Sequence, residues 1–383
     1  AASGEGDDDD DDYDDKDDDY GTGETTGTPW AASSGASRQD TWVNLTIGYS
    51  HHSQDRNTIY RGNISISNEY DYSSFGGGIG LVKLFNRKNT ELGVSANVFL
   101  DNWRPEYPTE LKTYIENNGN LNRDFFEGVP ILNQNGNVID KLSTNAWQPL
   151  KSSLIDDKKR NTFSFSISLS QIISKTTQIS IFSDIVYQSG WLANPMQRVY
   201  FADIANFYIG SASSIPFYTE DRNRDVFQLA DDIERLPKER LKIPIGVRLN
   251  QYINENIVFR SFYRYYYDNW GIQAHTFDGE LAIKIGQNLT FYPNFRYYAQ
   301  NEADYFAPFE EHLSTEEFYT SDFDLSKFNS SQIGLGIKYT DIFTKSHIWR
   351  LGLKGLTLDY NYYQRNIGFT SHIVSIGADF VVD

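Results

Sequence analysis

The sequence contains no cysteine, and it has no run of about 18 apolar residues such as a membrane helix requires. The first absence excludes disulfides, thiolate nucleophiles and metal sites with cysteine ligands. The second excludes a helical membrane protein. Catalytic motifs are also missing: there is no Gly-x-Ser-x-Gly elbow, no His-Glu-x-x-His zinc motif and no phosphate-binding loop. The sequence thus gives no sign of an enzyme, although separate loops can assemble a hydrolase without such a motif.

Aromatic residues are abundant: the 383 residues include 26 tyrosines, 25 phenylalanines and 7 tryptophans. Tyrosine suits a membrane interface, where one end of the side chain is wet and the other is apolar. The aromatic residues cluster at segment ends, and we expect these clusters to form an aromatic belt, with a carbohydrate-stacking platform as the alternative. They are Tyr252, Tyr265, Tyr266, Tyr267, Trp270, Tyr297, Tyr298, Tyr360, Tyr362 and Tyr363.

Polar and apolar residues alternate strictly over residues 162–170. Phe163, Phe165, Ile167 and Leu169 fall on one face, and serines fall on the other. Such a period of two is typical of a strand between two unlike solvents, and its recurrence along a chain is typical of a transmembrane barrel. The fold class that we predict is therefore all-β, a transmembrane antiparallel outer-membrane β-barrel.

Thirteen segments show this pattern, each near the roughly ten residues that a tilted strand needs to cross a bilayer. They are 41–50, 58–70, 74–85, 90–101, 161–173, 177–189, 239–252, 256–268, 272–285, 288–300, 329–341, 354–364 and 368–382.

The connections between these segments alternate in length. Three long ones (102–160, 190–238 and 301–328) each follow an even-numbered segment, and those after odd-numbered segments are mostly short. In outer-membrane barrels, short turns face the periplasm and long loops face outside. We therefore predict a barrel over 41–383 with three long extracellular loops. In this topology, residues 1–40 are predicted to form an acidic extracellular loop or tail.

An odd number of strands conflicts with the even number found in single-chain barrels. One solution places an odd number of further strands, three in our preferred count, before residue 1, so that the full protein has about 16. The alternative is a 14-strand barrel in which 20–38 supplies the missing strand, but its glycines and Pro29 make it a poor strand.

Six stretches of the sequence are distinctive: 34–40, 187–191, 198–201, 236–240, 270–272 and 319–329. In this order they resemble a Gram-negative outer-membrane family known as domain of unknown function 3570. The resemblance implies a barrel of roughly sixteen strands without an established activity. Members of this family are encoded beside genes for a small lipoprotein, a thioredoxin-like protein and a flavin transferase. We also expect 319–328 to pack as an ordered lid rather than to span the membrane.

Side-chain parity predicts which charged residues face the lumen, because a charge at mid-membrane on the lipid side costs about 2–4 kcal/mol for Arg or Lys. Two interpretations stay open: a constriction lined by arginines that draws anions through, and a lumen closed by paired charges and loops. The lumen-lining candidates are Arg61, Arg248, Arg260, Arg264, Glu280, Lys284, Arg296, Asp359 and Asp379.

The net charge of −18 is concentrated in residues 7–19, which hold eleven aspartates. Crowded carboxylates attract hard cations such as Ca²⁺, although a run of like charges is usually a solvated, disordered tract. The calcium candidates are Asp7, Asp8, Asp9, Asp10, Asp11, Asp12, Asp14 and Asp15. No other cofactor is expected.

The sequence favours a non-enzymatic outer-membrane barrel of a Gram-negative bacterium. Its role would be the passage or capture of a small solute, or service as a membrane-embedded subunit of a larger complex. The expected partners are outer-membrane lipid and other outer-membrane proteins or lipoproteins, and the acidic balance argues against nucleic acid. The alternative function is a surface hydrolase built on the extracellular loops.

Overall fold

The computed structural model describes residues 41–151, 158–220, 223, 225–341, 344 and 347–382. They fall into two compact units. The larger holds the described residues of 33–108, 153–203 and 231–383, and the smaller holds those of 109–152 and 204–230. The predicted 1–40 segment, with its calcium candidates, lies outside the described residues.

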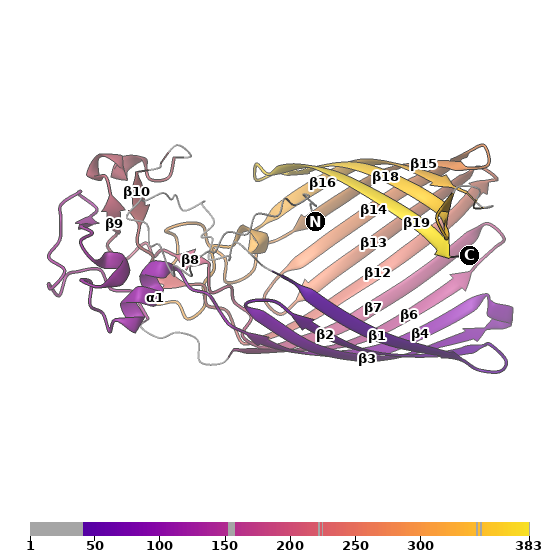
Figure 1. The fold of residues 1–383 in the computed structure, drawn as a ribbon, viewed down its shortest axis with the longest axis horizontal. Helices are drawn as coiled ribbons and strands as arrows, with labels where there is room; N and C mark the ends of the chain where they lie inside the picture. Colours follow the sequence, from indigo (N-terminus) through magenta and orange to yellow (C-terminus); the bar gives the residue numbers. More distant parts are fainter. Residues whose placement is uncertain are drawn as a thin grey trace. The chain divides into compact units, whose positions relative to one another are not determined.

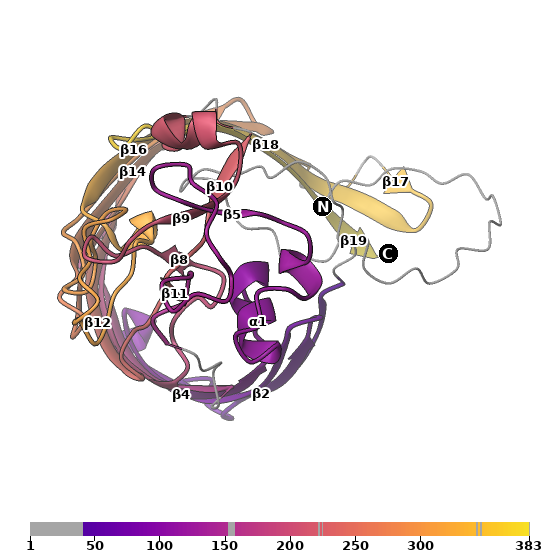
Figure 2. The same ribbon diagram turned by 90° about the vertical axis from the view of Figure 1, so that its left-hand side faces the viewer.

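The larger unit is built on one antiparallel sheet of fourteen strands that curves round on itself (Figures 1 and 2). One of them, β17 (His347–Ile348), is a two-residue piece beside β18, which leaves the thirteen long strands that the sequence predicts. A short 3-10 helix, η1 (Asn86–Lys88), forms one turn. The long strands pair in chain order: β1 (Val43–His52), β2 (Thr58–Asn68), β3 (Tyr72–Phe85), β4 (Thr90–Trp103), β6 (Lys159–Ile172), β7 (Thr177–Gly190), β12 (Glu239–Asn254), β13 (Ile257–Asp268), β14 (Gln273–Ile285), β15 (Leu289–Gln300), β16 (Phe328–Thr340), β18 (Leu351–Arg365) and β19 (Thr370–Val382).

The two faces of the sheet differ as the alternation predicts. In β6, Phe163, Phe165, Ile167 and Leu169 are 45–46% exposed, whereas the serines between them are less exposed. Exposed aliphatic and aromatic side chains continue on this outer face across the other strands, for example at Ile47, Ile185 and Leu358. Lipid is the solvent that can cover so continuous an apolar face, so the strands span a bilayer, and transmembrane barrels of this kind belong to outer membranes.

The inner face carries polar side chains and glycines. Gly246 of β12 lies directly beneath the ring of Phe182 on β7, where a Cβ atom would collide with that ring. The absence of a side chain at Gly246 lets Phe182 lie flat against the wall, 5.7 Å from the ring of Phe262. A bulky residue at position 246 would displace the Phe182 ring from this place.

The first and last strands do not pair with each other in the described part of the chain. β1 forms a ladder with β2, and β19 forms one with β18. Direct pairing of β1 with β19 would have removed the need for further strands. Such pairing is not found among these residues. The prediction that upstream strands complete the wall stays a prediction.

The three long connections all lie at one end of the strands, as the sequence predicts, and the short turns at 69–71, 269–272 and 366–369 lie at that end too. At the long-loop end, the larger unit carries three segments that pack together, namely 191–203, 231–238 and 301–327; we call them the cap. The cap contains the strand pair β8 (Arg198–Val199) and β11 (Asp232–Ile233) and the 3-10 helix η4 (Phe323–Leu325). Tyr319 and Thr320 are fully buried in it, so 319–327 packs as a lid and does not span. Phe328, which the prediction included in the lid, is instead the first residue of β16 (Phe328–Thr340).

The smaller unit is formed by parts of the first two long connections, which sequence analysis treated only as loops. Its core holds Trp147, Phe126 and Ile131, and Trp147 Nε1 donates to the Ala230 carbonyl at 3.2 Å. Among the described residues, no helix has the length and hydropathy that a membrane span requires. The elements are α1 (Thr109–Glu116), η2 (Asp124–Phe126), β5 (Ile131–Asn133), β9 (Phe207–Gly210), η3 (Ala212–Phe217) and β10 (Val226–Gln228), with β10, β9 and β5 forming one sheet.

Candidate functional site: the basic inner wall and the cap

The inner face of β12 to β15 carries more basic than acidic side chains; we call this surface the basic wall. Strand register places these residues on the same face, because directly paired residues share a side of the sheet. The basic residues are Arg240, Lys242, Arg248, Arg260, Arg264, Lys284 and Arg296, and the acidic ones are Asp268, Asp278 and Glu280.

Three of the predicted lumen arginines line one cavity of about 360 Å³ in this wall: Arg248, Arg260 and Arg296. Arg260 Nη1 lies 2.7 Å from Glu280 Oε1, and Arg296 Nε lies 3.7 Å from Asp278 Oδ1. Arg248 instead stacks over the rings of Phe182 and Phe262, at 5.6 and 5.5 Å. These contacts fix the directions of the guanidinium groups, whereas the charge of Arg248 is not neutralised by an ion pair in the described structure.

Arg264 lines a second cavity of about 280 Å³, together with Arg240 and Lys242 from β12. The Nε atom of Arg264 is buried and makes no hydrogen bond to the described residues. Arg240 is held more firmly: its Nε and Nη2 both donate to Asp268 Oδ2, at 2.9 and 2.5 Å, and its guanidinium stacks on Trp270 at 4.2 Å. A buried donor without a partner is costly, so Arg264 is ready for an acceptor.

The remaining lumen candidates are spread around the sheet. Lys284 stands opposite Thr290, and Arg61 stands opposite Gly80, far along the strand order from the basic wall. Asp359 stands opposite Gly336, and Asp379 pairs with Lys338 at 3.8 Å. The structure therefore brings the arginines of β12, β13 and β15 together with Glu280, and it does not bring Arg61 or Asp379 to them. Asp359 lies at the border of the basic wall, where it accepts a hydrogen bond from Tyr292 of β15.

Buried carboxylates hold the segments of the cap together. Glu234 accepts a hydrogen bond from the Asn194 backbone N–H at 2.6 Å and another from the Thr320 hydroxyl, so it joins all three segments. Asp232 accepts from the Tyr319 hydroxyl at 2.6 Å and binds Arg235 through both carboxylate oxygens, at 2.7 and 2.8 Å. Because these acids lie at the crossing points, the cap depends on them for its shape.

Burial changes the protonation of two cap carboxylates. It raises the pKa of Asp231 to about 7, although a hydrogen bond from the Phe201 backbone N–H opposes the shift. It likewise raises the pKa of Glu234 to about 7, against the hydrogen bonds from Thr320 and Asn194. Both groups therefore titrate close to neutrality, and the pKa of Asp322 is also raised by burial.

A cavity of about 400 Å³ lies where the cap meets the strand ends, lined by three tryptophans; we call it the Trp cavity. Trp103 and Trp191 each have a buried Nε1 atom without a hydrogen-bond partner in the described structure, whereas Trp270 Nε1 donates to the Glu239 carbonyl at 3.0 Å. Its lining comprises Trp103, Arg160, Trp191, Leu192, Ala193, Asn194, Pro195, Glu234, Leu236, Arg240, Trp270, Asp322 and Leu325.

Sequence analysis did not predict this cavity, and its assignment of Trp270 to the aromatic belt was wrong. Trp270 is 2% exposed. Strand alternation also splits the tyrosine runs, because Tyr266, Tyr298 and Tyr363 share the inner face. A signal was present: the stretches 187–191, 236–240, 270–272 and 319–329, which carry the family resemblance, all contribute to the lining of the Trp cavity.

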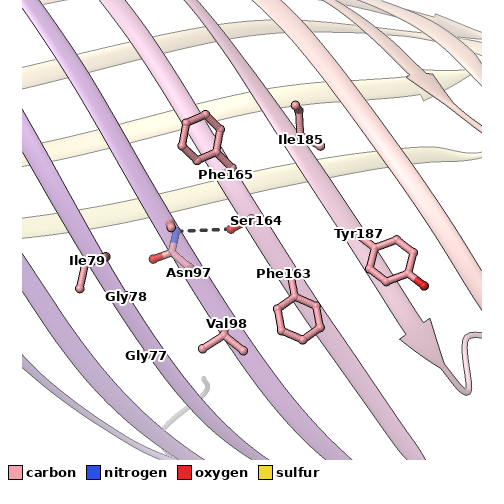
Figure 3. A pocket seen from close by; sticks show the side chains of 11 residues that line it. Gly77, Gly78, Ile79, Asn97, Val98, Phe163, Ser164, Phe165, Ile185 and Tyr187 are labelled. Carbon is pink, nitrogen blue, oxygen red and sulfur yellow. Dashed lines mark hydrogen bonds between the residues drawn. The ribbon is translucent and has the colours of Figure 1, made fainter.

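A further hollow of about 530 Å³ lies on the outer face, over β3, β4, β6 and β7 (Figure 3). The hollow exists because Gly77 and Ala96 have small side chains, whereas the residues around them, among them Ile79, Phe165 and Tyr187, have larger ones. Asn97 and Ser164, which donate and accept one hydrogen bond of 3.3 Å, belong to the opposite face. The hollow therefore faces lipid and not the lumen.

No group of three or more histidine and carboxylate side chains capable of holding a metal occurs within the described residues. His312, which is buried in the cap, uses both ring nitrogens. Its Nδ1 contacts Glu316 Oε2 at 2.6 Å, and its Nε2 donates to the Thr320 carbonyl at 2.9 Å. The ring thus has a structural place in the cap.

A family model described as a protein of unknown function (DUF3570) matches residues 16–372 of the sequence. The chain belongs to the DUF3570 family. No curated protein matches the sequence. This family member is an outer-membrane β-barrel, as its resemblance, its strand pattern and its apolar outer face each indicate.

Solved structures that resemble this DUF3570 chain are outer-membrane channels and receptors. The outer-membrane channel DcaP of Acinetobacter baumannii is 8% identical with a TM-score of 0.37, over 88% of this chain and 83% of that one. A mutant of the monoaromatic hydrocarbon channel TodX is 9% identical with a TM-score of 0.38, over 90% and 79%. The siderophore receptor PirA of A. baumannii is 10% identical with a TM-score of 0.42, over 90% of this chain but 49% of that receptor. TM-scores this low say nothing about the solute of this chain.

Proposed function

We propose that this protein is a non-enzymatic outer-membrane barrel that passes a small anionic solute along its basic wall. The observation that carries the proposal is the excess of basic over acidic side chains on the inner face of β12 to β15, next to cavities of about 360 and 280 Å³. A wall lined with fixed cations lowers the electrostatic barrier for an anion and raises it for a cation.

The contacts of the wall support passage rather than tight capture. Arg260 is 56% exposed in spite of its ion pair with Glu280, and Arg296 is 47% exposed, so solvent and solute can reach both. Arginine keeps its charge and presents several donors in one plane. A row of such partly neutralised sites binds an anion well enough to admit it and weakly enough to release it.

Two competing functions make different demands. A closed structural subunit needs a lumen in which the basic charges are neutralised, whereas Arg248 and Arg264 have no ion pair in the described structure. A hydrolase built on the cap needs a histidine free to act as a base, whereas the cap histidine, His312, is engaged through both nitrogens. The described residues thus favour passage over both.

Conductance of the full-length protein in planar bilayers tests the proposal. A KCl gradient should give a reversal potential of the sign expected for anion selectivity. The double variant Arg248→Gln and Arg264→Gln should move that potential towards zero, and the control Lys175→Gln, in the exposed turn between β6 and β7, should leave it unchanged. A protein that inserts but does not conduct, or that prefers cations, would refute passage of anions.

A further inference from the structure

The Trp cavity and the neighbouring cavity around Arg264 share Arg240 and Leu325 in their linings, so they adjoin. We infer that together they bind an acidic sugar, with the sugar ring in the Trp cavity and its carboxylate at Lys242 and Arg264. This inference rests on the proposed passage of anions and names the class of solute.

The Trp cavity has the features of a site for a sugar ring. Its volume of about 400 Å³ lies within the range of small-ligand sites, roughly 300–1,000 Å³. Indole rings offer flat apolar surfaces to the C–H face of a pyranose, and Trp191, unlike Trp103 and Trp270, carries no stacked guanidinium group in the described structure. Trp103 and Trp191 also have buried Nε1 donors without protein acceptors, and the hydroxyl oxygens of a sugar are acceptors. An aromatic hydrocarbon would use the ring faces but leave both donors unsatisfied.

The charged side chains of the Trp cavity already have partners, including Asp322, which accepts a hydrogen bond from the Asp324 backbone N–H at 2.9 Å, and this suits an uncharged ring. Arg160 Nε lies 3.3 Å from Asp101 Oδ2 and its guanidinium stacks on Trp103, at 4.7 Å. Arg240 is bound to Asp268 and stacks on Trp270. Glu234 already accepts two hydrogen bonds from the cap. A second strong charge placed here would have to compete with these partners.

The adjoining cavity supplies the place for the negative group. Lys242 and Arg264 line it, and the buried Nε of Arg264 makes no hydrogen bond to the described residues. Among the described residues that line this cavity, Asp324 alone carries a carboxylate; it is 69% exposed and is bound by Arg365 at 2.7 Å. A carboxylate that reaches from the Trp cavity therefore meets donors and positive charge.

Calorimetric titration of the full-length protein in detergent tests the inference with three probes. D-glucuronate and D-glucose differ at a single carbon, which carries a carboxylate in the first and a hydroxymethyl group in the second. Acetate carries the carboxylate without the ring. We expect glucuronate to bind more tightly than glucose by about tenfold or more, as a hydrogen-bonded charge contributes, and acetate to bind least.

Two variants separate the two halves of the site. Trp191→Phe keeps an aromatic face but loses the donor, and should weaken glucuronate and glucose alike by about fivefold, the usual effect of one hydrogen bond. Arg264→Gln should weaken glucuronate by about tenfold and leave glucose unchanged. Trp349→Phe, in a turn where Trp349 is 90% exposed, is the matched control and should change neither.

Failure of this inference can be told from failure of the proposed function. If acetate binds as well as glucuronate while conductance is anion-selective, the wall recognises charge alone and the sugar is refuted. If glucuronate binds as expected while the conductance prefers cations, passage of anions is refuted and the sugar site stands. If none of the three probes binds, or Trp191→Phe binds both sugars as the unchanged protein does, the Trp cavity is not a sugar site.

Discussion

The hydroxyl of Tyr319 offers a sharp test of how the cap is held together. Tyr319 is fully buried and donates to Asp232 Oδ2 at 2.6 Å. A hydrogen bond to a charged group contributes about 1.5–3 kcal/mol. In Tyr319→Phe, Asp232 keeps its two bonds from Arg235, so its charge is not left alone. We therefore expect a loss near the lower limit, about 1.5 kcal/mol, or roughly tenfold in the equilibrium between closed and open cap.

Hydrogen exchange of backbone amides measures this loss where it occurs. The Tyr319 N–H donates to the Arg235 carbonyl at 2.8 Å, and the Arg235 N–H donates to the Tyr319 carbonyl at 3.0 Å. Both amides should exchange about ten times faster in Tyr319→Phe, because local opening sets their rate. Amides in β12 to β15 should keep their rates.

The matched control is Tyr305→Phe, in the same cap. The ring of Tyr305 packs against Trp270 and Phe318, but its hydroxyl makes no hydrogen bond to the described residues. This variant should leave the two amides unchanged. Equal acceleration in both variants, or acceleration of the long strands along with the cap, would refute the view that the Tyr319 hydroxyl stabilises a separately opening cap.

Three further predictions concern the cap, the wall and the loops. Burial raises the pKa of Asp231 from 3.8 to about 7 and that of Glu234 from 4.5 to about 7. Between about pH 4 and 7 the folded cap therefore binds more protons than the open cap, so the cap loses stability as the pH rises through this window. Hydrogen exchange of the cap amides, normalised to intrinsic rates, should therefore be faster at pH 8 than at pH 5. Glu234→Gln should reduce this difference between the two pH values, and slower exchange at pH 8 than at pH 5 would contradict the prediction. Spin labels at 163, 165, 167 and 169 should be accessible to a lipid-soluble quencher and labels at 164, 166 and 168 should not, and equal access would contradict the two faces of β6. Protease added to intact cells should cut only within 102–160, 190–238 or 301–328, if anywhere, and a cut at 253–255 or 286–287 would invert the topology.

The strands were predictable because their physical cause is local. A bilayer outside and a polar interior impose a period of two, and residues such as Phe163 to Leu169 display that period without reference to the rest of the chain. The alternation also predicted correctly that Arg248, Arg260 and Arg264 share one face of the sheet, because the strand ladders have few irregularities there. Register between neighbouring strands is what brings them to Glu280, and a list of inward residues does not contain that information.

The cap and the Trp cavity could not be predicted in the same way, because their causes are contacts between distant segments. Trp103, Trp191 and Trp270 each stand just where a strand ends or turns, which is also where a belt residue would stand. Trp270 is buried against residues distant in the sequence, such as Arg240 and Tyr305, and Glu234 meets Asn194 and Thr320 because three segments of the cap pack together. Periodicity assigns a residue to a face, but it says nothing about which loop covers it.

The two interpretations of the lumen that the sequence left open describe different parts of one wall. Ion pairs such as Arg260 with Glu280 and Arg240 with Asp268 hold guanidinium groups in fixed directions, as a sealed interior would. Arg248 and Arg264 add positive charge that no ion pair in the described structure removes. Recognition of an anion needs guanidinium groups that point in fixed directions and also carry positive charge that no carboxylate neutralises. A mobile guanidinium group binds anions without selectivity, and one that is fully ion-paired does not bind them. Glu280 therefore fixes the direction of Arg260, and Glu280→Gln should change the anion selectivity of the conductance through Arg260 although Glu280 itself repels anions.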